Sequence, residues 1–200
     1  MMDKILVING SYHDDGITDQ TLDIIKRILE GKAATVDVIY LRDYPIGFCF
    51  NCRECTQIPG DAPSRCVQDD GMTDLVAKIE AANAYILAAP TNLSSVTAVF
   101  KRFMERLAVY AYWPWGRPAP KFRKAKLQTK KALIVSSCAA PGFIGRWLFS
   151  SYRQLKMTAN VIGAKPVGTL FTGLASNEPN QQLTQKQKNR AETFALKLLK

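Results

Sequence analysis

The sequence predicts a doubly wound α/β fold, in which a five-stranded parallel sheet carries helices on both faces. Five short apolar runs alternate along the chain with segments whose apolar residues recur at helical spacing. The runs are nearly continuous in apolar residues, which is typical of parallel strands buried on both sides. Neither an internal repeat nor a low-complexity linker divides the chain, so we expect one domain over residues 1–200.

The first half of the chain begins with the clearest strand, loop and helix. The apolar run Lys4–Asn9 ends at a glycine, and an amphipathic segment over 18–31 follows, so a strand, a tight loop and a helix are predicted. Residues 35–40 form the second predicted strand, because they are rich in β-branched side chains. A cysteine-bearing loop over 41–70 comes next, and the helical spacing returns over 72–79.

The second half repeats the alternation. The third predicted strand, over 84–89, ends at a proline, and apolar residues at helical spacing follow over 96–107. A long connection, aromatic and then basic, leads to the fourth strand, over 132–137. One helix is predicted from Ile144 to Leu155. The remaining elements are a fifth strand over 166–171 and a last helix over 191–198.

The charge is strongly positive, with 27 Lys and Arg against 17 Asp and Glu and a formal net charge of +10. Such a surface attracts either nucleic acid or small polyanions such as flavin and nicotinamide phosphates. Because the chain carries no recognisable DNA or RNA motif, we expect no nucleic-acid partner. It also lacks a signal peptide and an apolar run long enough to cross a bilayer, so we expect a cytoplasmic protein without a membrane partner.

Three loops that follow predicted strands are suited to a ligand. In doubly wound sheets the ligand binds outside the carboxyl ends of the strands, where backbone N–H groups and a helix dipole favour a phosphate. The hydroxyls of Ser11, Thr18 and Thr21 could complete such a cradle. Each loop alone could be an ordinary turn and helix cap, but three together favour one nucleotide-like site. The candidate cofactor contacts are Ser11, Gly16, Ile17, Thr18, Asp19, Gln20, Pro90, Thr91, Asn92, Leu93, Ser94, Ser137, Cys138 and Ala139.

The missing motifs narrow the choice of nucleotide. The chain contains neither the G-x-G-x-x-G loop of dinucleotide-binding proteins nor the G-x-x-x-x-G-K-[ST] loop of nucleoside triphosphatases. A hydroxyl-lined mononucleotide loop after the first strand fits FMN.

Several motifs in order resemble the NADPH-dependent FMN reductase family, which is flavodoxin-like, and its iron–sulfur flavoprotein branch. They are the Gly10-Ser11…Gly16-Ile-Thr18 loop, Asp69-Asp70-Gly-Met72, the apolar strand that ends at Pro90, and Val-Phe-Lys101-Arg-Phe-Met-Glu-Arg106. The resemblance covers residue 1 to about residue 173. The chain departs from the family pattern at Ile17, where Asn is usual, and at Asn92, where many members carry an aromatic residue.

The resemblance implies a flavodoxin-like sheet in the order 2-1-3-4-5. It also implies an enzyme that transfers two electrons from NAD(P)H through FMN to a small-molecule acceptor such as a quinone or free flavin. Members of the family usually pair, so a homodimer or homotetramer is expected. Hydride chemistry belongs to the flavin; we therefore expect no catalytic acid–base pair, and we interpret the lone His13 as a surface loop residue.

Four cysteines form a second candidate site. Cys49, Cys52 and Cys55 have C-x2-C-x2-C spacing, and Cys66 follows after ten residues, so the four thiols could converge on one centre. The iron–sulfur flavoprotein branch holds a [4Fe–4S] cluster with a similar arrangement whose last gap is shorter. A zinc site and plain thiols are the alternatives.

An aromatic cluster and a basic stretch follow the third helix. Tyr112 and Trp113 are predicted to line the acceptor pocket, although such a cluster could also be a dimer contact or part of the core. Residues 117–131 carry seven basic residues and no acids, and form either a solvated connection or a surface that attracts NADPH. The main alternative function is an electron-transfer flavoprotein, with or without a cluster on the loop from Cys49 to Cys66; a nucleic-acid-binding module is the third.

Overall fold

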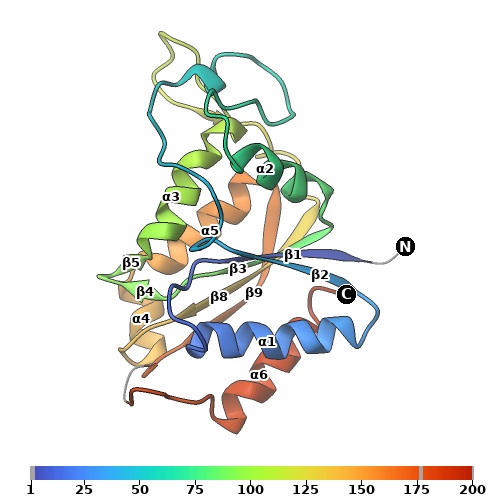
Figure 1. Ribbon diagram of the computed structural model, residues 1–200, viewed down its shortest axis with the longest axis vertical. Helices are drawn as coiled ribbons and strands as arrows, with labels where there is room; N and C mark the ends of the chain where they lie inside the picture. The colour runs from blue at the N-terminus through green and yellow to red at the C-terminus, as the bar shows by residue number, and fades with distance from the viewer. Residues whose placement is uncertain (1–2, 176–177, 200) are drawn as a thin grey trace.

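The computed structural model describes residues 3–175 and 178–199, so the ends of the predicted 1–200 unit lie outside the described part. Five strands form one parallel sheet in the order β2-β1-β3-β8-β9, which confirms the predicted order (Figure 1). The strands are β1 (Lys4–Asn9), β2 (Thr35–Tyr40), β3 (Ala84–Ala88), β8 (Lys130–Ser137) and β9 (Ala164–Thr172).

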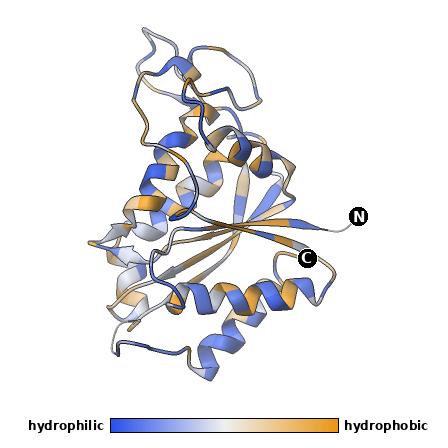
Figure 2. Ribbon diagram, in the orientation of Figure 1, coloured by the Kyte–Doolittle hydropathy of each residue, from blue (hydrophilic) through white to orange (hydrophobic). Residues whose placement is uncertain are grey.

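Helices cover both faces of this sheet, and each face has its own apolar core. In Figure 2 the strands carry many hydrophobic residues, whereas the visible side of α6 is hydrophilic. One face packs against α1 (Ile17–Glu30) and α6 (Gln185–Ala195), and the other against α2 (Met72–Ala81), α3 (Ala98–Arg106) and α5 (Ser151–Val161). No helix of the described residues is long and apolar enough to cross a membrane.

Shorter elements surround the carboxyl ends of the strands and the long loop. Two antiparallel strand pairs were not expected from the sequence, because two-residue strands leave no periodic pattern. The short elements are η1 (Glu54–Thr56), β4 (Thr91–Asn92), β5 (Ser95–Val96), η2 (Leu107–Tyr110), β6 (Ala111–Tyr112), β7 (Lys121–Phe122) and α4 (Gly142–Leu148).

The single helix predicted from Ile144 to Leu155 is wrong. Residue Phe149 has an extended backbone that separates α4 from α5. Next to it, the backbone N–H and the hydroxyl of Ser150 both donate to the Ser94 carbonyl, at 2.8 and 2.7 Å. The helical spacing of apolar residues runs across this break in the sequence. The spacing could not reveal the break, because the break depends on hydrogen bonds to the distant loop that contains Ser94.

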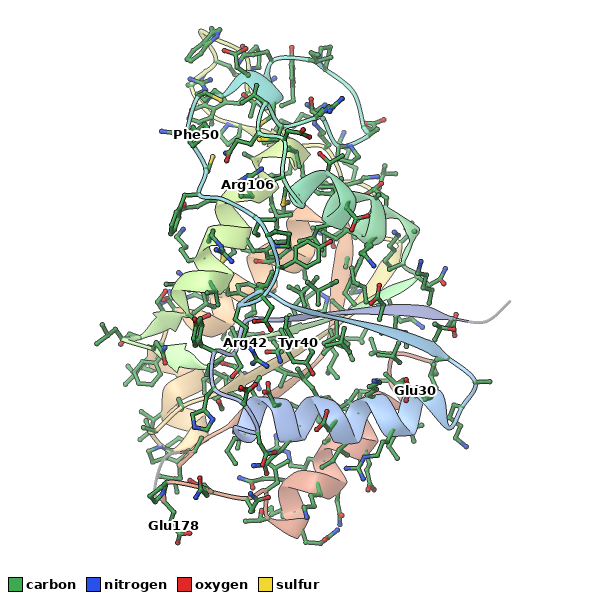
Figure 3. The ribbon with its side chains drawn as sticks, in the orientation of Figure 1. Glu30, Tyr40, Arg42, Phe50, Arg106 and Glu178 are labelled. Carbon is green, nitrogen blue, oxygen red and sulfur yellow. The ribbon has the colours of Figure 1, made fainter. Side chains whose placement is uncertain are left out.

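A buried ion pair holds the long loop over 41–70 against α3. The Arg106 guanidinium at the end of α3 donates to both carboxylate oxygens of Asp70, at 2.6 and 2.9 Å, and to the Gly47 carbonyl at 3.0 Å. Figure 3 shows Arg106 beneath the part of the loop that bears Phe50. Burial by itself would raise the pKa of Asp70, but hydrogen bonds from Arg106 and the N–H groups of Gly47 and Met72 lower it to about 2.

We therefore predict that Asp70→Asn destabilises the protein by roughly 3 kcal/mol, because it leaves the buried guanidinium without its carboxylate. The folded pKa lies below the ordinary value of about 4, so the pair stabilises the protein above that pH and loses its contribution as the pH falls toward 2. Urea unfolding at pH 7 and through the acid range measures both effects. The Asn variant should show a shallower loss of stability below pH 4, and parallel curves for the two proteins would contradict the prediction.

Candidate functional site

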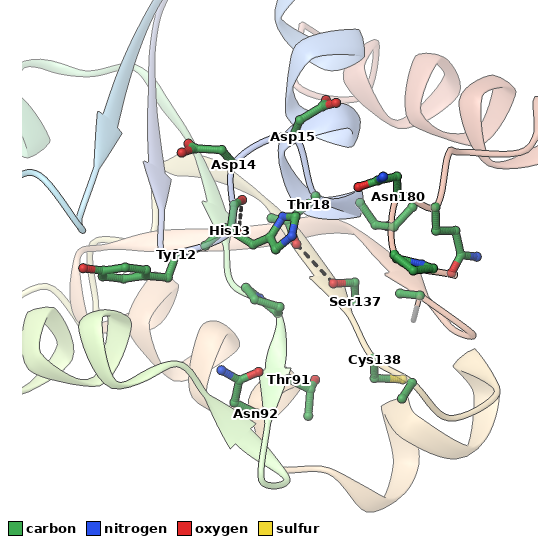
Figure 4. A pocket seen from close by; sticks show the side chains of 18 of the residues that line it. Tyr12, His13, Asp14, Asp15, Thr18, Thr91, Asn92, Ser137, Cys138 and Asn180 are labelled. Carbon is green, nitrogen blue, oxygen red and sulfur yellow. Dashed lines mark hydrogen bonds between the residues drawn. The ribbon is translucent and has the colours of Figure 1, made fainter. Parts of the chain in front are cut away.

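A cavity of about 860 Å³ opens at the carboxyl ends of β1, β3 and β8 (Figure 4). The three predicted loops all contribute to its lining. Ten of the fourteen candidate contacts line it: Ser11, Gly16, Ile17, Thr18, Pro90, Thr91, Asn92, Ser137, Cys138 and Ala139.

The amino-terminal end of α1 forms the first wall. Gly16 precedes the helix and has no side chain with which to cap it, and Ile17 and Thr18 of the first turn line the cavity. The first amides of a helix lack partners within the helix and lie at its positive end. An anion bound here would therefore meet unpaired N–H groups without displacing a side chain.

Close packing sets the position of the loop that joins β1 to α1. A Cβ atom on Gly10 would lie 2.7 Å from Phe100 of α3, so only glycine allows this approach. The Thr97 hydroxyl donates to the Gly10 carbonyl at 2.6 Å, and the Phe100 N–H donates to the same hydroxyl at 3.3 Å. The N-cap of α3 thus fixes the loop after β1.

Hydroxyl groups from two loops meet inside the cavity. Thr18 Oγ1 and Ser137 Oγ lie 3.1 Å apart, and Figure 4 shows this contact between α1 and the end of β8. The Ser11 hydroxyl donates to the His13 carbonyl at 3.1 Å. Thr21 is absent from the lining and donates instead to the Ile17 carbonyl at 2.7 Å, so it does not complete the cradle as expected.

The other two loops form the opposite wall. Thr91 is held by the Ser151 hydroxyl, with the two oxygens 2.7 Å apart, and Asn92 lies beside it in Figure 4. Cys138 is buried and its thiol donates to the Ala140 carbonyl at 3.1 Å. Burial raises the pKa of this thiol, as suits a packing residue rather than a nucleophile.

Four candidate contacts lie outside the lining. Leu93 and Ser94 form the tip of the β4–β5 turn, with φ angles of 43° and 62°, and Leu93 is fully exposed. Asp19 is buried between α1 and the end of β1, where the Asn9 amide donates to it at 2.7 Å; burial raises the pKa of its carboxyl. The Gln20 side chain instead contacts a segment after β9 that was not predicted from the sequence to lie at the site.

That segment, residues 178–182, follows β9 and closes one side of the cavity. The Gln20 amide donates to the Gln181 carbonyl at 3.0 Å, and its oxygen accepts from the Leu183 N–H at 3.1 Å. Asn180 lies beside Thr18 and Ser137 in Figure 4. The segment has no motif of its own, and only the return of the chain past β9 brings it here. The other lining residues outside the candidate set are Tyr12, His13, Asp14, Asp15, Thr97 and Ala175.

Arg42, just after β2, braces the loop after β1 from outside. Its guanidinium pairs with Asp14, lies 3.7 Å from Asp19 and donates to the Ser11 carbonyl at 3.3 Å. It also lies over the Tyr40 ring, and Figure 3 labels both residues. Arg42 thus ties the loop after β1 to the end of β2.

The four candidate metal ligands line a second cavity, of about 220 Å³. Cys49, Cys52, Cys55 and Cys66 share it with apolar side chains from α3 and α5. Within residues 3–175 and 178–199, no group of three or more His, Cys, Asp or Glu side chains is arranged to hold a metal ion. Burial, with the neighbouring thiols adding to it, raises the pKa of Cys55 to about 11.

Two arginines hold the cysteine loop to the β6–β7 pair. The buried Arg123 side chain donates to the carbonyls of Gly60, Ile58 and Val109, at 2.9, 2.8 and 3.1 Å. Arg53 lies between two indole rings, 3.7 Å from the centre of Trp113 and 4.3 Å from that of Trp115.

The aromatic cluster therefore packs on the cysteine loop. Trp113 lines the cysteine cavity rather than the cavity at the strand tips, and Tyr112 lines neither. Their role toward an acceptor stays a prediction that the geometry of one chain does not favour. The basic stretch is not simply solvated either, because Lys124 pairs with Glu80 at 2.7 Å and Lys130 donates to the Glu80 carbonyl at 2.7 Å.

Comparison with protein families gives a match to the family described as NADPH-dependent FMN reductase over residues 3–175. Curated relatives include an iron–sulfur flavoprotein of Archaeoglobus fulgidus, 32% identical over 111 residues, which are 56% of this chain and 48% of that protein. An iron–sulfur flavoprotein of Clostridioides difficile is 30% identical over 105 residues, 51% of this chain and 44% of that protein. The matched region thus spans about half the length of these relatives.

Solved structures share the fold at low identity. An FMN-dependent NADH-azoreductase from Bacillus anthracis in complex with FMN superposes with a TM-score of 0.67 and 13% identity, covering 99% of this chain and 100% of that one. A flavone reductase gives 0.64 and 17%, covering 96% and 60%. These likenesses support the flavodoxin-like architecture.

We predict that Arg123→Met frees the cysteine loop, because methionine keeps much of the packing but none of the donors. Alkylation of the buried Cys55 by iodoacetamide, followed by peptide mass spectrometry, should become at least tenfold faster. Lys121→Met, an exposed neighbour on β7, serves as the matched control and should leave the rate unchanged. Equal rates for wild type and Arg123→Met would show that the loop is held by other contacts.

Proposed function

The chain belongs to the NADPH-dependent FMN reductase family, and on that premise we propose that it is an FMN-dependent oxidoreductase that passes electrons from NAD(P)H to a small acceptor such as a quinone or free flavin. The observation that carries the proposal is the convergence of three strand-tip loops on one cavity beside an uncapped helix end. The cavity is of the size and place at which doubly wound sheets bind nucleotides.

The lining residues fit FMN in their donor chemistry. The first turn of α1, with the hydroxyls of Ser11, Thr18 and Ser137, suits the terminal phosphate. Backbone groups of Pro90–Asn92 and Cys138–Ala139 suit the polar edge of a flat ring system. The Asp14 carboxylate is drawn toward Arg42 and so repels a phosphate less than a free one would.

When bound, FMN would supply hydride and electron transfer. The protein's share is to bind, orient and exclude water. The buried strand ends and the segment 178–182 shield the inner part of the cavity. The titratable side chains in the lining include His13, Asp14, Asp15 and Glu178, and they lie on outer loops, so no acid–base pair is assigned.

An electron-transfer flavoprotein with a [4Fe–4S] cluster is the second candidate function. It is favoured by one observation, that all four cysteines line the same cavity. Cys49, Cys52, Cys55 and Cys66 would be the ligands, after their side chains turn inward. The name of the Archaeoglobus and Clostridioides relatives agrees with this candidate.

The donor and the assembly remain predictions. NADPH is the expected donor, and the exposed part of the basic stretch 117–131 would favour its additional phosphate. Homodimer or homotetramer formation is expected from the family and is measured by light scattering.

We predict that Thr18→Val weakens FMN binding at least tenfold, because the isosteric side chain removes a hydroxyl and leaves Ser137 without its partner. Fluorescence quenching of free FMN on titration measures the affinity. Thr193→Val removes an exposed hydroxyl on α6 and should bind FMN like wild type. Undiminished affinity in the Thr18 variant would place the phosphate elsewhere.

The two candidate functions are separated by reconstituting the protein anaerobically with iron and sulfide. If the cluster forms, iron and sulfide should be retained in equal amounts and be lost in Cys66→Ser. Cys138→Ser, which changes a cysteine outside the cysteine cavity, should retain them. Retention of neither element by wild type would exclude the cluster-bearing candidate.

A further inference from the structure

Helix α4 exposes its large apolar side chains and turns its two glycines toward the protein, with Gly145 buried. Phe143, Ile144, Trp147 and Leu148, here called the apolar ridge, are 80%, 36%, 85% and 57% exposed. A scattered exposed apolar residue is ordinary, but four on two turns form a contiguous patch of the kind that marks an interaction site.

Tight packing on the inner side of α4 keeps the ridge outward. A Cβ atom on Gly145 would lie 2.5 Å from the Cys138 sulfur and 2.9 Å from the Phe171 ring. One on Gly142 would lie 3.1 Å from the Gly173 nitrogen. The helix therefore cannot turn its large side chains toward the protein, and folding alone does not explain them.

A basic groove of about 590 Å³ lies next to the ridge, between α5, β9 and α6. Arg146 of α4 lines it and lies 5.1 Å from the centre of the Tyr152 ring, so ridge and groove are joined by one side chain. Lys156 and Lys165 are the other two charges in its lining, which contains no acidic side chain among the described residues.

The charge of this part of the chain is one-sided. Residues 106–177 contain 12 Lys and Arg and not one Asp or Glu. Glu178, the next acid along the chain, lines the cavity at the strand tips instead. Arg106 and Arg123 are buried and Lys124 pairs with Glu80, so the charges next to the ridge are those of the groove, Arg146, Lys156 and Lys165, which attract anions.

We propose that the ridge and the basic groove together dock the protein on an anionic lipid surface. Exposed Phe, Trp, Ile and Leu beside Arg and Lys are the combination with which peripheral helices enter the headgroup region, and this needs no spanning helix. The groove would hold lipid phosphates while the ridge enters the acyl boundary. The proposal departs from the expectation, made from the sequence, of no membrane partner.

Charge complementarity favours lipid over a second copy of the chain. A two-fold interface through α4 would bring the basic grooves of both copies together, and the described lining of the groove contains no acidic side chain to offset Arg146, Lys156 and Lys165. The four side chains of the ridge also offer a small area compared with the roughly 800 Å² that each partner buries in a stable dimer.

The position of α4 links this surface to the proposed function. Ala139 lines the cavity at the strand tips, and α4 begins three residues later. Docking would hold the edge of that cavity near the bilayer, where lipid-soluble acceptors reside. This last link alone rests on the proposed function; the lipid contact does not.

Cosedimentation of the full chain with vesicles tests the proposal. Wild type should bind vesicles of phosphatidylcholine mixed with phosphatidylglycerol, and bind phosphatidylcholine alone at least tenfold more weakly. Phe143→Ser/Trp147→Ser should lose at least tenfold, and Lys156→Gln/Lys165→Gln about tenfold at low salt. Two matched controls should bind like wild type: Phe48→Ser, an exposed aromatic on the cysteine loop, and Lys32→Gln/Lys188→Gln, which removes two exposed charges elsewhere.

Several outcomes would overturn the proposal. They are equal binding of wild type and the ridge variant, equal loss in the controls, or no binding to either vesicle. A dimer that the ridge variant dissociates in light scattering, with no vesicle binding, would assign the ridge to a second copy. Thermal unfolding checks that each variant is folded. Thr18→Val should bind vesicles like wild type, so failure of the flavin proposal is seen separately.

Discussion

The common direction of the five strands is the constraint on which the rest of the structure depends. In a parallel sheet all carboxyl ends meet at one edge, so loops that are distant in sequence share one region of space. Here the loops after β1, β3 and β8 form one cavity, and the hydroxyls of Thr18 and Ser137 meet although 119 residues separate them. Close packing of Gly10 against Phe100 then fixes the position of the loop after β1 at the wall of that cavity.

Outside the sheet, buried guanidinium groups hold the long loop over 41–70 in place. The loop over 41–70 has almost no regular structure, so its backbone groups cannot pair within a helix or a sheet. Arg106 binds Asp70 and the Gly47 carbonyl, and Arg123 binds carbonyls of the cysteine loop. Arginine suits this use because one planar side chain donates in several directions and keeps its charge when buried. The cysteines are thus positioned by α3 and by β7.

The surface around α4 follows from a different requirement. Glycines on its inner side allow the loop that contains Cys138 to approach closely, and the large apolar residues are left outside. Arg146, Lys156 and Lys165 of the neighbouring groove add positive charge beside them. The cavity at the strand tips, the cysteine cavity and the apolar ridge therefore lie on separate elements of one framework, joined through the ends of β8 and α3.

The sequence by itself determined the five strands and most of the cavity at the strand tips, because apolar periodicity and loop chemistry are local properties that survive without tertiary context. The order of the strands followed from the resemblance to a known family and not from periodicity. The sequence did not show the break at Phe149, because helical spacing contains no information about the hydrogen bond from Ser150 to the loop that contains Ser94. Only the tertiary structure placed residues 178–182 over the cavity, Trp113 against the cysteines and Arg146 between ridge and groove. These positions depend on contacts between segments that are far apart in the sequence. A pattern along the chain does not show which distant segments come close in space.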